Sequence, residues 1–295
     1  MTYQMLLQFT RKHLQGMNEG LEIPMVENPS LESQELLCYC TNQNKTQFFL
    51  HLQEEVKAEV QEQVEALLKR RETGEPIAYL LGEWDFYGKT FELTPDVLIP
   101  RLDTEVLVQK AVTRSGQLGG RILDLCAGSG CIGITIANLS KVEQVILGEI
   151  SPKAREICKK NIKRHNLEGS VICEDIDALA PPEHEGFSVI VCNPPYIPTK
   201  EIPTLSPMVR DFEPHLALDG GEDGLDFYRA ITKNWSSTLV EGGYFLFEVG
   251  IYQSKAVSQM LKNEGFIQVE ITYDTQKIGR VVEGRKPIET NIETN

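Results

Sequence analysis

One stretch limits the folds open to this chain more than any other: an apolar run, residues 187–192, that ends at Asn193-Pro194-Pro195-Tyr196. An apolar run of this kind predicts a buried parallel strand. Two prolines cannot continue a sheet, because each lacks a backbone N–H and has a fixed φ. The strand is therefore expected to stop at Asn193. A stiff loop then follows at its carboxyl end, which is where ligands bind in open α/β sheets.

The residue types in this loop favour chemistry on a planar nitrogen. The Asn193 side-chain oxygen and the Pro194 carbonyl can each accept one N–H of an –NH2 group. Such a grip orients a nitrogen whose lone pair is otherwise shared by resonance, and the Tyr196 ring can pack on the flat group. We predict that Asn193, Pro194 and Tyr196 are catalytic in methyl transfer and that they bind the substrate together with Pro195. The alternative is a simple strand-ending turn.

A second apolar strand, residues 121–125, leads into a glycine-rich loop at 126–130 and then a helix. Glycines let the backbone approach a ligand, and a helix N-terminus presents free N–H groups. The spacing Gly128-x-Gly130-x-x-Gly133 matches a dinucleotide fingerprint, which alone is a weak signal. Asp124 argues against a pyrophosphate, which it would repel, and favours an ammonium group such as that of S-adenosylmethionine.

Two further predicted strands also end in acidic residues, Glu149 and Asp175. A carboxylate at Glu149, about 20 residues past the glycine loop, suits ribose hydroxyls. Asp175 is expected to accept from an adenine amino group, while Ile176 covers the face of that ring. With Asp124, these acids fall on one edge of the sheet, which favours a ligand site over solvated strand ends.

The pattern of the chain changes near residue 80. Apolar residues recur at helical spacing in 1–80, which predicts a small helical bundle. Two β-prone runs around a glycine turn predict a hairpin linker at 81–95. Alternating strand and helix patterns fill 96–286, and 287–295 form a polar, loose tail. The chain is thus predicted to be a doubly wound α/β domain with a helical N-terminal domain, which either stabilises the protein or docks a partner.

Some bounds within these parts are also predicted. Ser30 or Ser33 is expected to cap the second helix. Apolar residues at helical spacing run on from about 45 to 71, and residues 73–80 break the helix. Residues 197–224 form a long irregular stretch with several prolines, which predicts a functional lid or rim.

Charge and cysteine content restrict the partners. A net charge of −14 disfavours direct nucleic-acid binding, which needs a basic surface, and permits a basic protein partner. Seven cysteines without C-x-x-C spacing and five scattered histidines predict neither a metal site nor a disulfide framework. Reduced thiols indicate a cytoplasmic protein. We expect no membrane span and no secretory signal, because no long apolar run and no cleavage pattern are present.

Several segments together resemble one known family. They are Gly74–Gly82, Ile99–Glu105, Asp124–Gly130, Asn193–Tyr196 and Phe212–Gly224. In these segments the chain is similar to the class I, S-adenosylmethionine-dependent protein-(glutamine-N5) methyltransferases of the HemK/PrmC family, which modify peptide chain release factors. The similarity extends over nearly the whole chain.

The resemblance implies a mostly parallel seven-stranded sheet and a defined reaction. A methyl group would pass from S-adenosylmethionine to the N5 atom of the glutamine in the Gly-Gly-Gln motif of class 1 release factors, leaving S-adenosylhomocysteine. The helical domain would dock the release factor, and we expect a monomer. Arg101, which precedes a predicted helix, is either a solvated charge or a residue that steadies a carboxylate of the cofactor or substrate. The predicted cofactor-binding residues are Arg101, Asp124, Cys126, Ala127, Gly128, Ser129, Gly130, Glu149, Asp175, Ile176 and Asn193.

The chain departs from the family pattern at a few positions. Leu102 stands where the family commonly has proline, and Cys126-Ala127 replace a frequent Gly-Thr. Glu149 stands where aspartate is common, which keeps the carboxylate and lengthens its reach. Thr104-Glu105 favours the release-factor branch over the sister branch that acts on a ribosomal protein.

Three other functions compete with this interpretation. An adenine-N6 methyltransferase would suit the same loop, but it needs a flipped base and a basic groove. A nicotinamide dehydrogenase would use Gly128–Gly133, but it gives Asn193–Tyr196 no role. A cofactor-binding scaffold without activity would have no need of Asn193 and Tyr196.

Overall fold

A computed structural model of the protein describes residues 1–21 and 24–289, and the chain forms two compact units. One unit comprises Met1–Gly82 together with Ser206–Phe212, and the other comprises Glu83–Leu205 together with Glu213–Asn295. The last six residues of the predicted tail lie outside the described residues. The assignment of these parts to docking, linking and catalysis stays a prediction.

The smaller unit is a group of helices around an apolar core that includes Leu6, Leu36 and Phe48. Arg71 is buried in this unit, and its Nε lies 3.0 Å from Oε2 of Glu32. This charged hydrogen bond joins two of the helices at their buried side. The helices are α1 (Tyr3–Gly16), α2 (Pro29–Thr41), α3 (Lys45–Leu50), α4 (Ala58–Glu72), α5 (Ile77–Leu81) and α9 (Pro207–Phe212).

The predicted cap of α2 is wrong. Asn28 caps this helix, rather than Ser30 or Ser33, and its side chain accepts from the backbone N–H of Leu31. Pro29 takes the first helical position, where its missing N–H costs nothing, so the cap must precede it.

The apolar pattern from 45 to 71 does not form one continuous helix. It breaks into α3 and α4, because residues 54–56 pair with the chain start: the N–H of Val56 donates to the Met1 carbonyl over 2.9 Å. The expected helix break at 73–80 is also wrong in part. This stretch contains most of α5, whose residues Ile77–Leu80 are buried.

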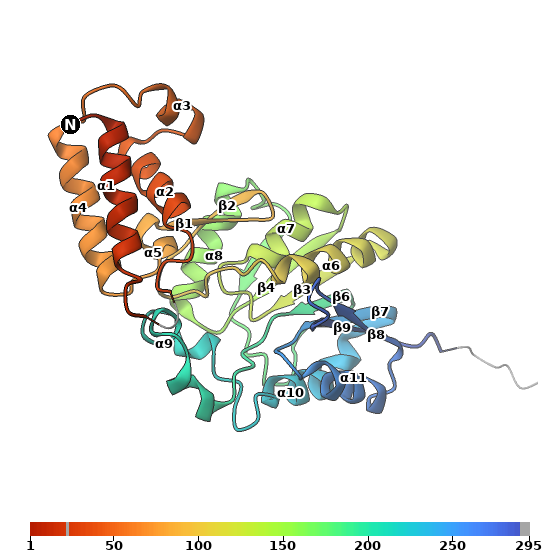
Figure 1. The fold of residues 1–295 in the computed structure, drawn as a ribbon. Coiled ribbons are helices and arrows are strands. Elements are labelled where there is room, and N and C mark those ends of the chain that lie inside the picture. The colour runs from red at the N-terminus through yellow and green to blue at the C-terminus, as the bar shows by residue number, and fades with distance from the viewer. Residues whose placement is uncertain (22–23, 290–295) are drawn as a thin grey trace, which may run out of the picture. The chain divides into compact units, whose positions relative to one another are not determined.

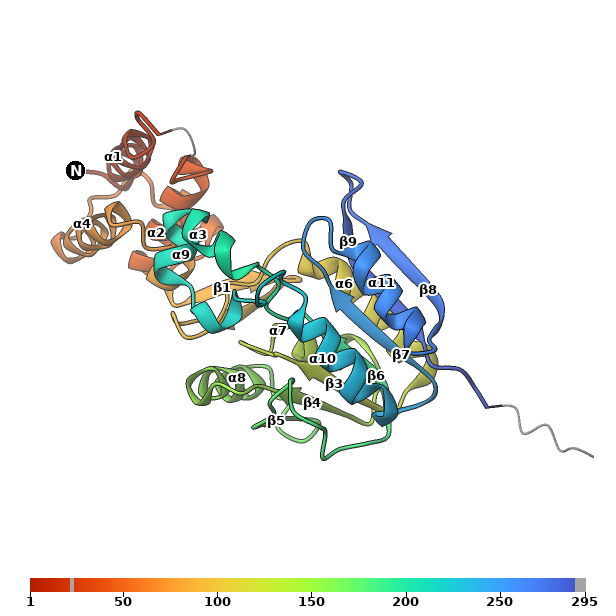
Figure 2. The ribbon, with the colours of Figure 1, turned by 90° about the horizontal axis from the view of Figure 1, so that it is seen from below.

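The larger unit contains the predicted seven-stranded, mostly parallel sheet, which is thereby confirmed (Figures 1 and 2). Its strand order is β5-β4-β3-β6-β7-β9-β8, and β9 runs antiparallel to both of its neighbours. The strands are β3 (Arg121–Leu125), β4 (Gln144–Gly148), β5 (Val171–Glu174), β6 (Phe187–Cys192), β7 (Leu239–Glu248), β8 (Ile267–Tyr273) and β9 (Gly279–Arg285).

The order of the strands creates a switch point between β3 and β6. The chain moves outward from β3 through β4 to β5 and then returns to the other side of β3. Leu125 and Cys192 are register partners, so Cys126 and Asn193 leave the sheet side by side at its carboxyl edge. This is the place where open α/β sheets bind ligands.

Helices cover both faces of this sheet, which explains the unbroken apolar run of β6. All six residues of β6 are buried, and alternate side chains enter two different cores. One face is covered by α6 (Thr104–Leu118), α7 (Cys131–Leu139) and α8 (Pro152–Arg164), and the other by α10 (Asp226–Trp235) and α11 (Ser254–Asn263) (Figures 1 and 2).

Both predicted connections contain regular secondary structure. The predicted hairpin is present as β1 (Glu83–Phe86) and β2 (Lys89–Glu92), with positive φ at Tyr87 and Gly88 as a tight hairpin turn requires. The stretch predicted to be irregular contains short helical turns, η1 (Thr199–Thr204), α9 and η2 (His215–Ala217). Among the helices of the described chain, none has both the length and the apolar character needed to cross a bilayer.

Candidate functional site

The glycine loop after β3 is held close to the sheet by Asp124 and Gly133. Oδ2 of Asp124 accepts the backbone N–H of Gly133 over 2.9 Å, which satisfies one free donor at the start of α7. A Cβ atom on Gly133 would lie 2.2 Å from Leu147 Cδ2 of β4. Only glycine therefore allows α7 to pack this closely on the strand, and the third glycine of the motif has a packing reason.

The Asp124 carboxyl group is fully buried. Burial raises its pKa to about 7, although the hydrogen bond from Gly133 lowers it. Its second oxygen, Oδ1, has no hydrogen-bond partner among the residues that the structure describes. A buried acceptor without a partner is uncommon, and a donor from a ligand would satisfy it.

Glu149 accepts a hydrogen bond from the same glycine loop and lines the cavity. Its Oε2 accepts the N–H of Gly128 and its Oε1 accepts the N–H of Ser151, each over 2.8 Å. The side chain thus bridges the glycine loop after β3 and the start of α8. The longer reach of glutamate, compared with the aspartate common in the family pattern, is used for these two bonds.

Asn161 of α8 supports the loop through hydrogen bonds, a role that was not predicted from the sequence. It is fully buried, its Nδ2 donates to the carbonyls of Ser129 and Glu92 over 2.9 and 3.0 Å, and its Oδ1 accepts the N–H of Glu92 over 2.7 Å. The available signal was a polar residue in the apolar stripe of a helix, beside Ile157 and Ile162.

A cavity of about 270 Å³ lies at the carboxyl edge of the sheet, at the switch point between β3 and β6. Of the predicted site residues it brings together Arg101, Cys126, Ala127, Gly128, Ser129, Glu149, Ile176, Asn193 and Pro195. Further lining residues, which were not predicted from the sequence, include Thr104, Ile132, Ile150, Asp177, Ala178, Leu179, Leu216 and Phe227.

The predicted residues Asp124, Gly130, Pro194 and Tyr196 are not part of this lining, and neither is Asp175. The Asp175 carboxylate is largely exposed, and its Oδ1 lies 2.7 Å from Arg155 Nη1.

The structure therefore does not bring Asp175 to the cavity. Of the two aspartates that follow β5, it is Asp177 that lines the cavity, and its Oδ1 accepts the N–H of Leu179 over 2.9 Å.

The loop after β6 presents acceptors that the protein itself does not use. Asn193 is half-buried and lines the cavity. Within residues 1–21 and 24–289, neither its side-chain amide nor the Pro194 carbonyl takes part in a hydrogen bond. Behind them, burial and, to a smaller extent, the nearby Glu248 carboxyl raise the pKa of Tyr196 to about 12. The phenol is thus neutral at any physiological pH.

Arg101 contacts Glu213 at the rim of the cavity. The Glu213 side chain is almost completely buried and forms an ion pair with the guanidinium of Arg101. Burial raises the pKa of Glu213, whereas Arg101 lowers it. The neighbouring Leu102 is 80% exposed, so the leucine that departs from the family pattern projects from the surface.

Comparison with known proteins gives matches along most of the chain. Residues 18–82 match the PrmC N-terminal domain, and residues 101–222 match the methyltransferase small domain. A release factor glutamine methyltransferase from Geobacter sulfurreducens is 38% identical over 265 residues, which cover 88% of this chain and 90% of that protein. The protein of the same name from Clostridium acetobutylicum is 39% identical over 255 residues, or 85% and 89% of the two chains.

Solved structures show the same fold. A methyltransferase from Pyrococcus furiosus aligns with a TM-score of 0.52 at 16% identity, covering 69% of this chain and 91% of that chain. At this identity the likeness concerns the arrangement of the sheet and its helices.

Proposed function

The chain belongs to the release factor glutamine methyltransferase family, and we propose that the loop Asn193–Tyr196 is where it holds the glutamine of its substrate. The enzyme transfers a methyl group from S-adenosylmethionine to the side-chain amide nitrogen of a glutamine in a release factor, leaving S-adenosylhomocysteine. The observation that carries the proposal is the Asn193 amide, which lines the cavity without a hydrogen-bond partner among the described residues.

The lining of the cavity fits S-adenosylmethionine in its chemistry. We propose that Glu149 accepts from ribose hydroxyls and that Ile176 covers the adenine ring, with the loop 126–130 along the amino-acid part. Asp124 is buried and does not line the cavity itself, and we propose that its free Oδ1 attracts the ammonium group of the cofactor from its place in β3. Because Asp175 does not line the cavity, we propose Asp177 as the acceptor for the adenine amino group. Bound there, the cofactor supplies the methyl group on its sulfonium sulfur.

The proposed catalytic step depends on orientation. Asn193 Oδ1 and the Pro194 carbonyl each accept one N–H of the glutamine amide, and the Tyr196 ring packs on its plane. Holding both hydrogens fixes the plane of the amide and turns the face of the nitrogen toward the cavity. The two prolines keep the acceptors rigid, so no reorganisation is needed when the nitrogen reacts.

The finer identity of the substrate is also proposed. The target is the glutamine of the Gly-Gly-Gln motif in class 1 release factors, docked by residues 1–80 onto a monomeric enzyme without direct contact to nucleic acid. The acidic net charge of −14 supports a basic protein partner. The adenine-N6 alternative is less supported, because the relatives that match are named for glutamine methylation. The cytoplasmic location stays a prediction.

Mass spectrometry tests the proposed function directly. A class 1 release factor is incubated with the enzyme and S-adenosylmethionine, digested and analysed for a single methyl group on the tripeptide glutamine. The control is a release factor in which that glutamine is replaced by alanine, and it should stay unmodified. Methylation at another residue, or of adenine in an added RNA, would contradict the proposal.

A further inference from the structure

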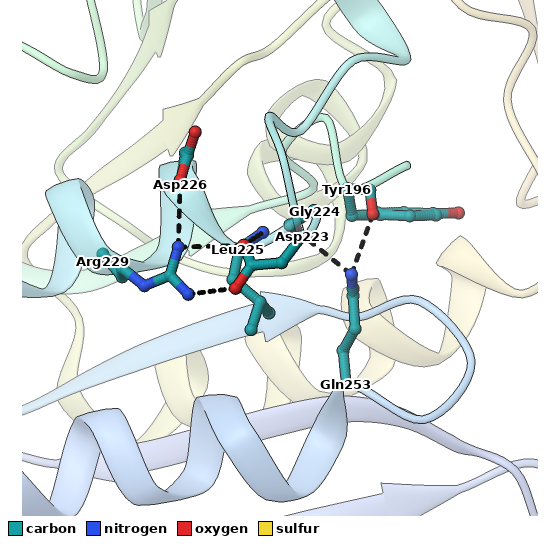
Figure 3. A network of polar contacts seen from close by, with 7 residues as sticks. All are labelled: Tyr196, Asp223, Gly224, Leu225, Asp226, Arg229 and Gln253. Carbon is teal, nitrogen blue, oxygen red and sulfur yellow. Dashed lines mark hydrogen bonds and ion pairs between the residues drawn. The ribbon is translucent and has the colours of Figure 1, made fainter. Parts of the chain in front are cut away.

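The side chain of Gln253, at the start of α11, joins three loops at one point. Its Nε2 donates to the carbonyl of Tyr196 over 2.8 Å and to that of Gly224 over 3.1 Å (Figure 3). Its Oε1 accepts the backbone N–H of Gly250 over 3.0 Å. Both hydrogens and the oxygen of the amide are thus in use, which no other uncharged side chain of this length can provide.

The turn that contains Gly224 is itself fixed, so Gln253 holds Tyr196 against a firm support. The Asp223 carboxylate accepts the N–H of Leu225 over 3.1 Å and forms an ion pair with Arg229 (Figure 3). Arg229 also contacts Asp226, over 3.0 Å. The position of the Gly224 carbonyl is therefore set independently of the Asn193–Tyr196 loop.

The residues that follow Tyr196 are hydrogen-bonded to the backbone of residues 218–221. The N–H of Ile197 donates to the Leu218 carbonyl over 3.0 Å, and the N–H of Gly220 donates to the Ile197 carbonyl over 2.9 Å. Next along the chain, the N–H of Thr199 donates to the carbonyl of Gly221 over 2.9 Å. The Gln253 bond to the Tyr196 carbonyl therefore extends this series of hydrogen bonds by one residue, from Ile197 back to Tyr196.

Two glycines leave the space that this arrangement needs. A Cβ atom on Gly224 would lie 2.3 Å from the Tyr196 oxygen and 2.7 Å from Gln253 Nε2. A Cβ atom on Gly250 would lie 2.8 Å from Gln253 Oε1 and 3.0 Å from Tyr196 Cδ2. The backbone can approach Tyr196 this closely only without side chains. Within the glycine-rich run at 219–224, Gly224 is therefore required by the close packing around Tyr196.

We infer that Gln253 is a positioning residue for methyl transfer. By holding the Tyr196 carbonyl, it fixes the backbone of Pro194–Tyr196 and with it the acceptor and the ring that orient the glutamine amide. This inference rests on the proposed function of that loop. Gln253 does not line the cavity, so it acts through Tyr196 rather than on substrate or cofactor.

The test compares Gln253→Met, which keeps the length of the side chain but removes all three hydrogen bonds, with Gln253→Glu. The glutamate still accepts the N–H of Gly250, but its second carboxylate oxygen faces the carbonyls of Tyr196 and Gly224, which it repels because it cannot donate a hydrogen bond to them. Both variants should lower kcat on the release factor on the order of 10²-fold, with the affinity for S-adenosylmethionine changed by less than about threefold. Gln259→Met is the matched control, because Gln259 is an exposed glutamine on the same helix.

A second readout does not depend on activity. Hydrogen exchange should show faster exchange at the amides of Ile197, Thr199 and Gly220 in Gln253→Met than in the wild type. Gly250→Ala, which pushes on Gln253 and Tyr196 without removing either, should have the same effect in a weaker form. Both variants are compared with the wild type for thermal unfolding, so that a general loss of structure is recognised.

Two results would overturn the inference. One is a Gln253→Met enzyme whose kcat and exchange pattern match the wild type. The other is an equal loss of kcat and cofactor affinity with exchange raised throughout the larger unit, which would mean a purely structural role. If the wild type does not methylate a release factor, the proposed function fails. The exchange of the residues after Tyr196 would then still decide whether Gln253 holds this loop.

Discussion

Glu149 Oε2 lies 2.8 Å from the backbone nitrogen of Gly128, so the acid proposed to bind ribose also shapes the loop beside it. Its other oxygen holds the N–H of Ser151. Each carboxylate oxygen keeps a lone pair free after these bonds, and a ligand can use it. Structural support and ligand binding therefore meet in one side chain.

Replacing Glu149 by alanine should weaken cofactor binding. The change removes a proposed ribose contact and leaves two loop amides without their acceptor, each a charge-assisted bond. We expect S-adenosylmethionine to bind about tenfold to a hundredfold more weakly in titration calorimetry. Glu174→Ala is the control, because Glu174 pairs with His184 and does not line the cavity. Unchanged affinity in Glu149→Ala would exclude the ribose role.

Replacing Asn193 by alanine should mainly slow the reaction. The substitution removes an acceptor aimed at the reacting nitrogen, so we expect kcat to fall on the order of 10²-fold or more. Cofactor affinity, measured separately by calorimetry, should change little. Asn263→Ala, an exposed asparagine on α11, should behave like the wild type. Activity within a few-fold of the wild type would show that the amide does not orient the substrate.

The buried Glu248 carboxyl should make the larger unit less stable as the pH rises. Burial raises its pKa from 4.5 to about 7, and its Oε2 has no hydrogen-bond partner among the described residues. Between these two values the folded protein keeps a proton that the unfolded chain releases. Stability therefore falls as the pH rises through this window, and the loss is complete above about 7.

Urea unfolding at pH 5 and pH 8 measures this effect. Both tryptophans, Trp84 and Trp235, lie in the larger unit, so their fluorescence reports on it. The contribution of Glu248 is at most about 3 kcal/mol, and Glu248→Gln should remove it, leaving a shallower pH dependence. Glu264→Gln, at an exposed site, is the control. An identical pH dependence in Glu248→Gln and the wild type would contradict the prediction.

Arg101 and Glu213 should be coupled in stability. Arg101→Ala leaves the buried Glu213 carboxylate without its cation and should lower the free energy of unfolding by about 1–3 kcal/mol. Adding Glu213→Gln removes the unpaired charge, so the double variant should recover part of this loss. A double-mutant cycle by urea denaturation measures the coupling. Strictly additive effects would mean that the ion pair contributes nothing.

Much of the larger unit follows from local sequence. The apolar run of β6 and its two prolines determine both a central strand and the residue where it stops. The acid near the end of β3, Asp124, and the acid after β4, Glu149, fall on the predicted edge for the same reason, because parallel strands with helices between them end on one side of the sheet. The residues that directly follow strand ends, such as Glu149 and Asn193, could therefore be placed at this edge from the sequence.

Residues that act through distant partners were not predicted. Asn161 and Gln253 bond to loops that lie tens of residues away in the chain. The polar residue in the apolar stripe of α8 indicates only that Asn161 is buried, and neither sequence neighbourhood identifies the partner. The prediction for Asp175 shows a different limit, because Asp177 rather than Asp175 lines the cavity. Both acids follow β5, and which of them faces the cavity depends on the path of the chain beyond the strand. Asp175 forms an ion pair with Arg155, whereas Asp177 lies in the lining of the cavity.

Phe212 and Gly74 belong to the same compact unit although 138 positions separate them: a Cβ atom on Gly74 would lie 3.5 Å from Phe212 Cε2. The helical unit is therefore assembled from two separate pieces of polypeptide. Cleavage at a single peptide bond cannot release the whole unit. A fragment that starts at Glu83 would still contain α9, which would lack the helices of its own unit. Any chimera that exchanges this unit between relatives must graft Ser206–Phe212 along with the first 82 residues.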